Sequence, residues 1–374
     1  MACSECGNCP GMGWWKRPYH GTQYGLVMDH DENSAQLLCV PIFRKAGCKV
    51  SPNGYAVEKL PEGGWLVELA SNLDEPPEVY LSVEPDYQVA MPSLFPIRWN
   101  GKQCRVAELP GTRSYLHLRF PNGRVDTIAD RVLPLEGGFN FRDLGGYRTQ
   151  SGKMVRWGKL YRSGRLSELT EGDRKYIQQL GIHTICDLRS PEECDIDRTP
   201  LELAQEIRHF PLNLSRNRGK GNNIGHINQA LVLSLLRDSY LAFTQSLEAY
   251  REFFQVLVTS DPEPVLFHCT AGKDRTGVTA ALLLWALDVP WDIIVQDFEI
   301  SNQFTTQLFQ LITTDGDIGS SHPLWPMARA YPENLEAAMA AITAKYGSIN
   351  EFFRQGLDLE PQWQEALQEK YLVP

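Results

Sequence analysis

The chain has 374 residues, 43% of them hydrophobic and 22% charged, a composition typical of a globular protein with room for two domains. Its formal net charge of −10 argues against nucleic acid or an anionic membrane surface as a partner, because the bulk of the protein repels both. No apolar run reaches the length of about 18 residues that a membrane-spanning helix needs, so we expect no integral membrane contact.

The amino-terminal segment, residues 1–30, is rich in glycine and cysteine. Cys3, Cys6 and Cys9 have a spacing that fits part of a metal or iron–sulfur site, but a fourth ligand is not evident. We therefore expect a flexible tail. The segment lacks the charged start and apolar stretch of a secretory signal, and the nine cysteines are an odd number, so a reducing, cytoplasmic location fits best.

Residues 31–133 have the pattern of an all-β domain. Short runs rich in Val, Leu, Tyr and Trp recur at 36–43, 64–69, 79–83 and 115–120. Asn-Gly pairs, which favour tight hairpin turns, occur at 53–54, 100–101 and 122–123. This pattern predicts a β-sandwich of the immunoglobulin or fibronectin type. We expect it to be an accessory packing domain; binding of a protein partner through its aromatic side chains is the alternative.

A second domain is predicted for residues 134–374, after a stretch with one proline and two glycines at 132–138. Arg142 and Asp143 have opposite charges and precede a Gly-Gly turn, where the backbone can pass close to another loop. They form either a brace beneath a binding site or an ordinary surface ion pair.

Residues 170–173 look like a capped helix start, and 182–188 like a buried strand. Asp187 and Arg189 lie at the carboxyl end of that strand, which is the edge where ligands gather in α/β sheets. Whether they contact a substrate or only support a neighbouring loop is open at this point.

The segment that follows offers no obvious acid. Residues 210–213 read Phe-Pro-Leu-Asn, without a carboxylate, and 214–229 form either a basic lid or a solvated loop. Residues 230–258 carry apolar side chains at helical spacing and are predicted to be core. Asp238 lies within this helix and is expected to face solvent.

The most informative stretch is His268 to Gly277, the cysteine loop, which reads His-Cys-Thr-Ala-Gly-Lys-Asp-Arg-Thr-Gly. It follows an apolar strand at 265–267 and opens an apolar helix at 278–287. A loop at a helix amino terminus directs N–H groups and the positive end of the helix dipole at an anion. The same field favours a thiolate at Cys269, and Arg275 offers a planar fork for two phosphoryl oxygens. We therefore predict a covalent phosphoryl transfer with Cys269 as nucleophile and neither metal nor cofactor.

Further helices are predicted at 292–304, 332–346 and 349–357, followed by a carboxyl-terminal tail.

The motif His-Cys-x5-Arg-Thr-Gly resembles the signature of cysteine-dependent protein-tyrosine phosphatases. The stretches Asn-Phe-Arg-Asp-Leu-Gly-Gly-Tyr at 140–147, Tyr-Arg-Ser at 161–163 and Asp-Leu-Arg-Ser at 187–190 are similar to the atypical bacterial members, some of which also act on phosphoinositides. The resemblance covers residues 135–374. It implies an α/β fold with a central sheet flanked by helices, and a phosphocysteine intermediate.

The resemblance also implies roles for individual residues. Asp274 occupies the loop position of the general acid in the atypical family, Thr276 would donate its hydroxyl to the Cys269 sulfur, and His268 would orient the loop. Arg142 and Asp143 would brace the loop. The expected phosphate-binding residues are Thr270, Ala271, Gly272, Lys273, Arg275 and Thr276.

The substrate is then a phosphorylated protein, with phosphotyrosine or dual specificity, or a phosphoinositide, which the cationic Lys273 would tolerate. A catalytically silent phosphopeptide-binding module is the alternative from another class, although the loop has every residue that turnover needs. A strand followed by Cys-x5-Arg also occurs in sulfur carriers, but the additional His, Gly and Thr residues argue against that class.

Overall fold

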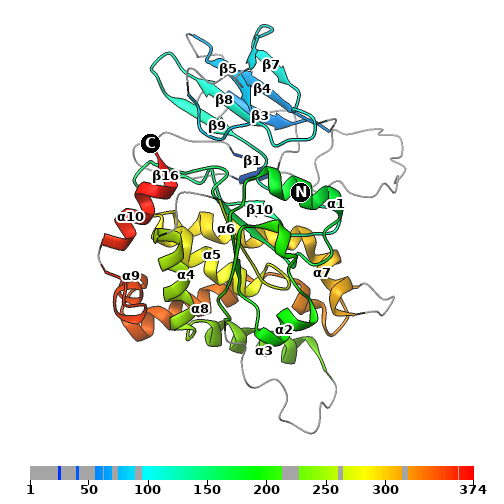
Figure 1. Cartoon of the computed structure of the whole chain (residues 1–374), viewed down its shortest axis with the longest axis vertical. Helices are drawn as coiled ribbons and strands as arrows, with labels where there is room; N and C mark the ends of the chain where they lie inside the picture. Colours follow the sequence, from blue (N-terminus) through cyan, green and yellow to red (C-terminus); the bar gives the residue numbers. More distant parts are fainter. Residues whose placement is uncertain are drawn as a thin grey trace, which may run out of the picture.

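The computed structural model of the chain describes residues 24–26, 39–41, 55–61, 63–69, 75–88, 95–212, 227–259, 264–313, 319–360 and 362–374. Figure 1 shows an all-β domain above a larger domain that mixes helices and strands. The predictions for the three amino-terminal cysteines, for Asn213 and for the lid at 214–226 lie outside the described residues.

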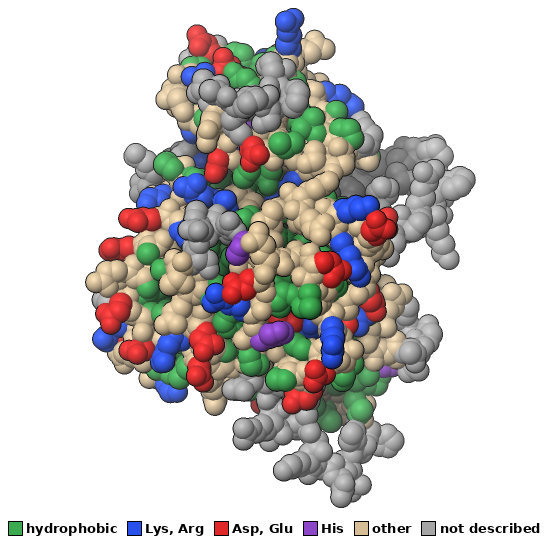
Figure 2. Space-filling model, in the orientation of Figure 1, with side chains coloured by type: hydrophobic (Ala, Val, Ile, Leu, Met, Phe, Trp, Pro, Cys, Tyr) green, Lys and Arg blue, Asp and Glu red, His purple; other side chains and the backbone are tan. Residues whose placement is uncertain are grey.

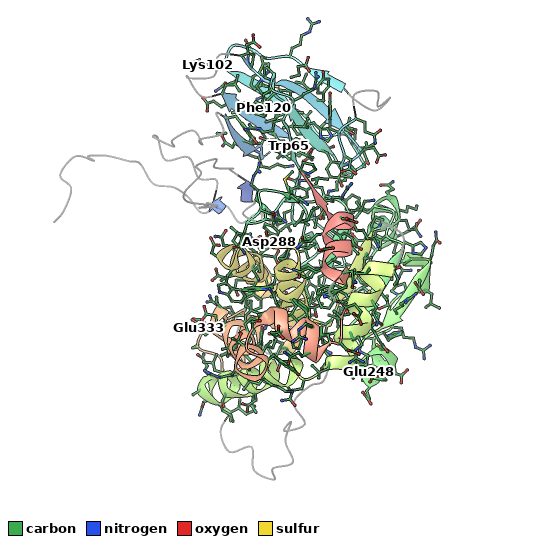
Figure 3. All side chains as sticks on the ribbon, turned by 90° about the vertical axis from the view of Figure 1, so that its left-hand side faces the viewer. Trp65, Lys102, Phe120, Glu248, Asp288 and Glu333 are labelled. Atoms are coloured by element: carbon green, nitrogen blue, oxygen red, sulfur yellow. The ribbon has the colours of Figure 1, made fainter. Side chains whose placement is uncertain are left out.

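The all-β domain has two antiparallel sheets around one apolar core. The strands are β3 (Tyr55–Lys59), β4 (Trp65–Leu69) and β7 (Gln103–Val106) in one sheet, and β6 (Phe95–Ile97), β5 (Glu78–Ser82), β8 (Tyr115–Arg119) and β9 (Val125–Ile128) in the other. A separate antiparallel pair joins β1 (Tyr24–Leu26) and β2 (Cys39–Pro41). Trp65 and Phe120, labelled in Figure 3, belong to the core. The Asn-Gly pair at 122–123 makes the turn between β8 and β9, with φ 86° at Gly123.

The second domain is built on one five-stranded sheet. Its order is β10 (Arg142–Asp143), β12 (Leu160–Ser163), β15 (Val265–His268), β13 (Thr184–Asp187) and β14 (Glu206–His209), and only the pairing of β10 with β12 is antiparallel. Because the other four strands are parallel, their carboxyl ends meet at one edge. Ser163, His268 and Asp187 are neighbours there in register. The predicted central sheet is thus confirmed, and it brings these three residues together.

Helices cover both faces of this sheet. Alternate strand residues divide between two apolar clusters: Leu160 and Phe267 pack with most of the helices, whereas Tyr161 and Leu266 pack with α1. The helical elements, coloured along the chain in Figure 1, are α1 (Glu171–Gln179), α2 (Pro191–Ile196), η1 (Leu201–Leu203), α3 (Gln229–Phe243), α4 (Leu247–Thr259), α5 (Asp274–Ala286), α6 (Trp291–Ile300), η2 (Ser301–Phe304), α7 (Thr305–Ile312), η3 (Trp325–Ala328), α8 (Pro332–Tyr346), α9 (Ile349–Glu351), a π turn at Phe352–Gly356 and α10 (Gln362–Tyr371). The nearly complete burial of α5 confirms the predicted central helix.

Two expectations about the helical part were wrong. Residues 230–258 form two helices rather than one, and Leu231 and Leu235 of α3 are exposed because the first turns of that helix bury only Val232. The predicted carboxyl-terminal tail is ordered. It forms α10 and then β16 (Leu372–Val373), which pairs with β11 (Met154–Val155) and buries Tyr371. Asp238 is exposed, as predicted.

In the described part of the chain no helix is long and apolar enough to cross a bilayer. Figure 2 shows acidic and basic side chains interspersed over one face of the molecule, without a continuous basic field.

The start of the second domain is held by one carboxylate. Asp173, in the first turn of α1, accepts hydrogen bonds from the backbone N–H groups of Glu136 (2.8 Å), Gly137 (2.8 Å) and Thr170 (3.0 Å). Burial alone would raise the pKa of Asp173, but these donors favour the charged form and the net pKa is lowered from 3.8.

We predict that Asp173→Ala lowers the free energy of unfolding at neutral pH by about 1–3 kcal/mol, because three donors lose their acceptor. A carboxyl with a lowered pKa stabilises the fold above its usual pKa of 3.8, and this stabilisation is lost as the pH falls through the folded value. In urea unfolding, the difference in unfolding free energy between the wild type and Asp173→Ala should therefore decrease as the pH falls below 3.8. Glu171→Gln, at an exposed position in the same turn, is the control; an equal effect of both changes would contradict the prediction.

Candidate active site

The cysteine loop lies at the carboxyl edge of the sheet, between β15 and α5. Cys269 follows the last strand residue and is buried, with 2% of its surface exposed. Gly272 has φ 63°, and a Cβ at this position would lie 2.4 Å from the carbonyl carbon of Ser163. A glycine is therefore required where the loop passes the end of β12.

The carbonyl groups of the loop are bound from outside. Three successive carbonyls accept hydrogen bonds from groups beyond the loop: Thr270 O from Arg165 N (3.0 Å), Ala271 O from Asn140 Nδ2 (3.2 Å), and Gly272 O from Asn140 Nδ2 (2.9 Å) and Arg162 Nη2 (2.9 Å). In a planar trans peptide the N–H points opposite to the carbonyl. The N–H groups of Ala271, Gly272 and Lys273 therefore face the interior of the loop, as an anion site needs.

Arg162 is held by a buried carboxylate, Asp297 of α6, and Asn140 is linked to the same carboxylate through Arg142. Its oxygens accept hydrogen bonds from Arg142 Nε (3.1 Å), Arg162 Nη1 (2.7 Å) and the Tyr147 hydroxyl (3.0 Å). Burial alone would raise the pKa of Asp297, but the two guanidinium groups lower it to about 2. Burial and the neighbouring Arg142 lower the pKa of Arg162 to about 10. Arg162 therefore remains charged at neutral pH.

Arg142 and Asp143 do not form the joint brace that the sequence predicted. The Arg142 side chain lies in the Asp297 network and also donates to the side chain of Asn140, whose φ of 57° is uncommon for a residue other than glycine. Asp143, the next residue in β10, points to the opposite face. It accepts hydrogen bonds from the N–H groups of Gly145 (2.7 Å) and Gly158 (2.6 Å), so it contacts the Gly-Gly turn and not the cysteine loop itself.

Arg275 is paired with a glutamate that the sequence analysis missed. Its Nη1 and Nη2 donate to the two carboxylate oxygens of Glu193, at 2.6 and 2.7 Å, and the Thr270 hydroxyl donates to the same carboxylate at 2.8 Å. Burial alone would raise the pKa of Glu193, but Arg275 lowers it to about 2, so the pair is fully charged at neutral pH. Nη1 and Nη2 also lie 3.4 Å from the Leu188 carbonyl oxygen and the Thr270 hydroxyl, respectively. These two contacts are long and a guanidinium has five N–H donors, so the group can still donate to a phosphoryl oxygen.

Asp187 and Arg189 lie at the base of the loop, where Asp187 is beside His268. Both are almost fully buried, and Arg189 Nη2 donates to Asp187 Oδ2 at 2.7 Å. His268 lies beside them, with Nε2 3.3 Å from the Thr199 hydroxyl and Nδ1 3.3 Å from the carbonyl oxygen of Cys269. Burial lowers the pKa of His268, which keeps the ring neutral at pH 7. These contacts are those of a positioning group.

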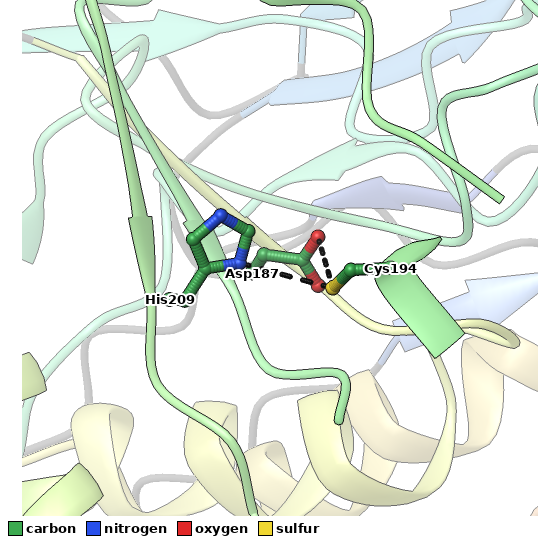
Figure 4. A group of neighbouring side chains, drawn as sticks. All are labelled: Asp187, Cys194 and His209. Carbon is green, nitrogen blue, oxygen red and sulfur yellow. Dashed lines mark hydrogen bonds between the residues drawn. The ribbon is translucent and has the colours of Figure 1, made fainter. Parts of the chain in front are cut away.

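Asp187 also belongs to a group of three potential metal ligands with Cys194 and His209, drawn in Figure 4. The group does not fit a metal ion. Oδ2 of Asp187 already accepts the short bond from Arg189, which would place a second cation beside the first. Burial and the nearby Asp187 raise the pKa of the Cys194 thiol to about 11, whereas metal binding needs the thiolate.

The remaining loop residues differ in how far they match the expectations. Asp274 Oδ1 accepts hydrogen bonds from the Tyr240 hydroxyl (2.7 Å) and from Lys273 Nζ (2.5 Å). Lys273 is buried, and its ammonium group contacts Asp274 rather than facing the interior of the loop. Thr276 Oγ1 is buried without a hydrogen-bond partner among the described residues, so the expected bond to the Cys269 sulfur is not formed.

Comparison with known proteins identifies the family of the chain. A model described as the tyrosine phosphatase family matches residues 133–373. The chain belongs to the tyrosine phosphatase family. The resemblance on which the sequence analysis relied is thereby confirmed, and the protein is a phosphatase.

Individual relatives of this phosphatase agree. A Cupriavidus necator protein whose name places it among the tyrosine-protein phosphatases is 31% identical over 251 residues, covering 64% of this chain and 86% of that protein. The triple specificity protein phosphatase PtpB of Mycobacterium tuberculosis is 30% identical over 265 residues, covering 61% of this chain and 94% of PtpB. A crystal structure of P. aeruginosa TpbA in complex with pTyr covers 58% of this chain and 88% of that one, but its 16% identity and TM-score of 0.24 are too low for a comparison of the sites.

A signal for Glu193 was present in the phosphatase sequence. Ser190-Pro-Glu-Glu193 is a capping box, in which Ser190 caps the helix and the glutamate three positions later bonds back to its N–H. The box predicts α2 and places Glu193 beside Asp187-Leu-Arg189. Nothing in the local sequence indicates that the same carboxylate also reaches Arg275.

We predict that Glu193→Gln lowers kcat/KM of the phosphatase by about 10–100-fold, because Arg275 loses the charged partner that fixes its plane and small misplacements at a reacting centre are costly. Since the pKa of Glu193 is about 2, the wild-type pair stays charged and the difference should persist over roughly pH 5 to 8. Steady-state kinetics with an aryl phosphate measure it. Glu192→Gln, on the exposed side of α2, is the matched control; unchanged kinetics of Glu193→Gln would refute the role.

Proposed function

We propose that this phosphatase hydrolyses phosphate monoesters, phosphotyrosine in proteins foremost, through a cysteinyl-phosphate intermediate on Cys269. The observation that carries the proposal is the shape of the cysteine loop, which is the expected phosphate loop. Its carbonyls are bound outward, its N–H groups face inward, and Cys269 and Arg275 lie at its two ends. Such preorganised donors stabilise the charge that develops on the phosphoryl oxygens.

In the first step the thiolate sulfur of Cys269 attacks phosphorus, and the bond from phosphorus to the ester oxygen breaks. The leaving oxygen takes a proton from Asp274. In the second step water attacks phosphorus and returns a proton to Asp274, which releases inorganic phosphate and the thiolate. Arg275 and the loop N–H groups carry the negative charge in both steps, so the reaction is proposed to need neither metal nor cofactor.

Asp274 is the proposed acid because it is the carboxyl group that begins α5, immediately beside Arg275, and it is partly exposed. Both hydrogen bonds that the described residues give it are accepted by Oδ1, which leaves Oδ2 to carry the proton. The other candidates are less suited, because Asp187 is bound to Arg189 and Asp238 lies exposed on α3.

Phosphotyrosine and dual specificity are favoured over a phosphoinositide substrate. The argument for a phosphoinositide rested on Lys273, whose ammonium group contacts Asp274. The relative from Mycobacterium tuberculosis is named for triple specificity, so a lipid headgroup is the second candidate. A side-by-side panel of phosphotyrosine, phosphoserine and phosphothreonine peptides and a soluble phosphoinositide separates them.

A cytoplasmic location is part of the proposal, since a free cysteine nucleophile persists in a reducing compartment.

The all-β domain is proposed to be a sandwich of the immunoglobulin or fibronectin type. Two antiparallel sheets around one core support this assignment.

We predict that Cys269→Ser abolishes turnover of an aryl phosphate but leaves binding of inorganic phosphate largely intact, because an alcohol ionises far less readily than a thiol while the N–H groups and Arg275 remain. Turnover is measured without added metal and binding by calorimetry. Cys104→Ala, in the core of the β domain, is the chemical control and should keep its activity. Wild-type activity in Cys269→Ser would eliminate the cysteine mechanism, and an inactive wild-type protein would favour the silent binding module.

We predict that Asp274→Asn lowers kcat for alkyl phosphates by about 10²–10⁴-fold and for aryl phosphates with good leaving groups much less, because only poor leaving groups need the proton. A series of esters of increasing leaving-group pKa measures the effect. Asp238→Asn on α3 is the control and should not alter the series. An equal loss for good and poor leaving groups would show that Asp274 positions the loop instead.

A further inference from the structure

The two faces of strands β10 and β12 make different contacts. In register, Arg142 lies opposite Arg162 and Asp143 lies opposite Tyr161. Successive strand residues point to opposite faces, so the two arginines share the face that binds Asp297 and the carbonyl of Gly272. Asp143 and Tyr161 share the other face, which is turned toward the β domain.

That second face is occupied by Arg113, a residue of the β domain that precedes the region matched by the family. Its Nη1 donates to Asp143 Oδ2 at 2.6 Å and to the Tyr161 hydroxyl at 2.9 Å, and its Nη2 donates to the carbonyl of Asp130 at 3.1 Å. Arg113 is 6% exposed and Asp143 is fully buried. The phosphatase region thus contains a buried carboxylate whose salt bridge comes from the other domain.

A second arginine that precedes the matched region makes a parallel contact. Arg131 Nη1 donates to the carbonyl oxygen of Asp143 at 2.8 Å, and its guanidinium lies 3.6 Å from the centre of the Tyr147 ring. The Tyr147 hydroxyl is one of the donors to Asp297. Both arginines therefore contact the segment from Arg142 to Tyr147, whose other contacts hold the cysteine loop.

We propose that Arg113 is a positioning residue for the phosphatase reaction, through which the β domain sets the geometry of the cysteine loop. The inference rests on the proposed function of that loop. Asp143 and Tyr161 are the direct chain neighbours of Arg142 and Arg162. A shift of Asp143 and Tyr161 would move the guanidinium groups of these two arginines. The guanidinium of Arg162 orients the carbonyl of Gly272, and that of Arg142 acts through Asn140 on the carbonyl of Ala271. Displacements of about 1 Å at a reacting centre can cost about 100-fold in rate.

The test is Arg113→Met in the full-length protein, which removes the charge and keeps most of the side-chain volume. We expect kcat to fall by about 10–100-fold with a smaller change in KM, and the inhibition constant of inorganic phosphate to rise, in protein shown to be folded by its thermal transition. Asp143→Asn should have a similar effect, and the double variant should be little worse than either single one. Arg119→Met, an exposed arginine of β8 whose partner is Glu78, is the matched control.

A role in stability alone predicts a different result. In that case Arg113→Met lowers the melting temperature but retains wild-type kcat and phosphate inhibition well below it, and this outcome overturns the proposal. If Arg113→Met does not fold, Arg113→Lys decides: it keeps the charge but cannot reach Asp143, Tyr161 and Asp130 together. A lowered kcat in the folded lysine variant supports the proposal, and an unchanged kcat overturns it. Failure of the proposed function is recognised separately, as turnover that survives Cys269→Ser.

Discussion

The ion pairs of Asp297 are the interaction on which the rest of the site depends. Arg142 and Arg162 lie directly opposite each other on neighbouring strands, and both are fully buried. Two like charges in that position would destabilise the sheet, but Asp297 accepts a hydrogen bond from each. With this shared anionic partner between them, the arginines donate further hydrogens to Gly272 and Asn140. Without the carboxylate, two buried guanidinium groups would face each other with no anionic partner, which is costly in free energy.

The sequence predicted what is local. The strand, loop and helix around Cys269 follow from apolar runs and glycines, and the capping box at Thr170 starts α1. It did not predict Asp297, which looks like any acidic residue of an amphipathic helix until the sheet places it 3.1 Å from Arg142. Pairings over such distances in the chain depend on tertiary packing, which has no signature in a short stretch of sequence.

The errors have the same origin. Arg142 and Asp143 were joined in one brace because they are adjacent, yet adjacent strand residues point to opposite faces, so one binds Asp297 and the other Arg113. Leu231 and Leu235 were assigned to the core by spacing, but spacing defines only a helix face and not what covers it. The ordered carboxyl terminus depends on β11, a partner that lies more than half the chain away.

Charge at the site is balanced locally rather than by the whole molecule. Glu193 faces Arg275, Asp274 faces Lys273, and Asp297 lies between two arginines. Among the side chains that the structure describes around the loop, these pairs leave little unpaired cationic charge to attract a substrate from a distance, in a chain whose net charge is −10. The backbone N–H groups of the loop and the amino terminus of α5 are then the main source of attraction for a phosphoryl group, and both act over a few ångströms. We therefore propose that the site selects a phosphate that a docked substrate has already brought to the loop, so that the shape of the loop matters more than the field of the protein.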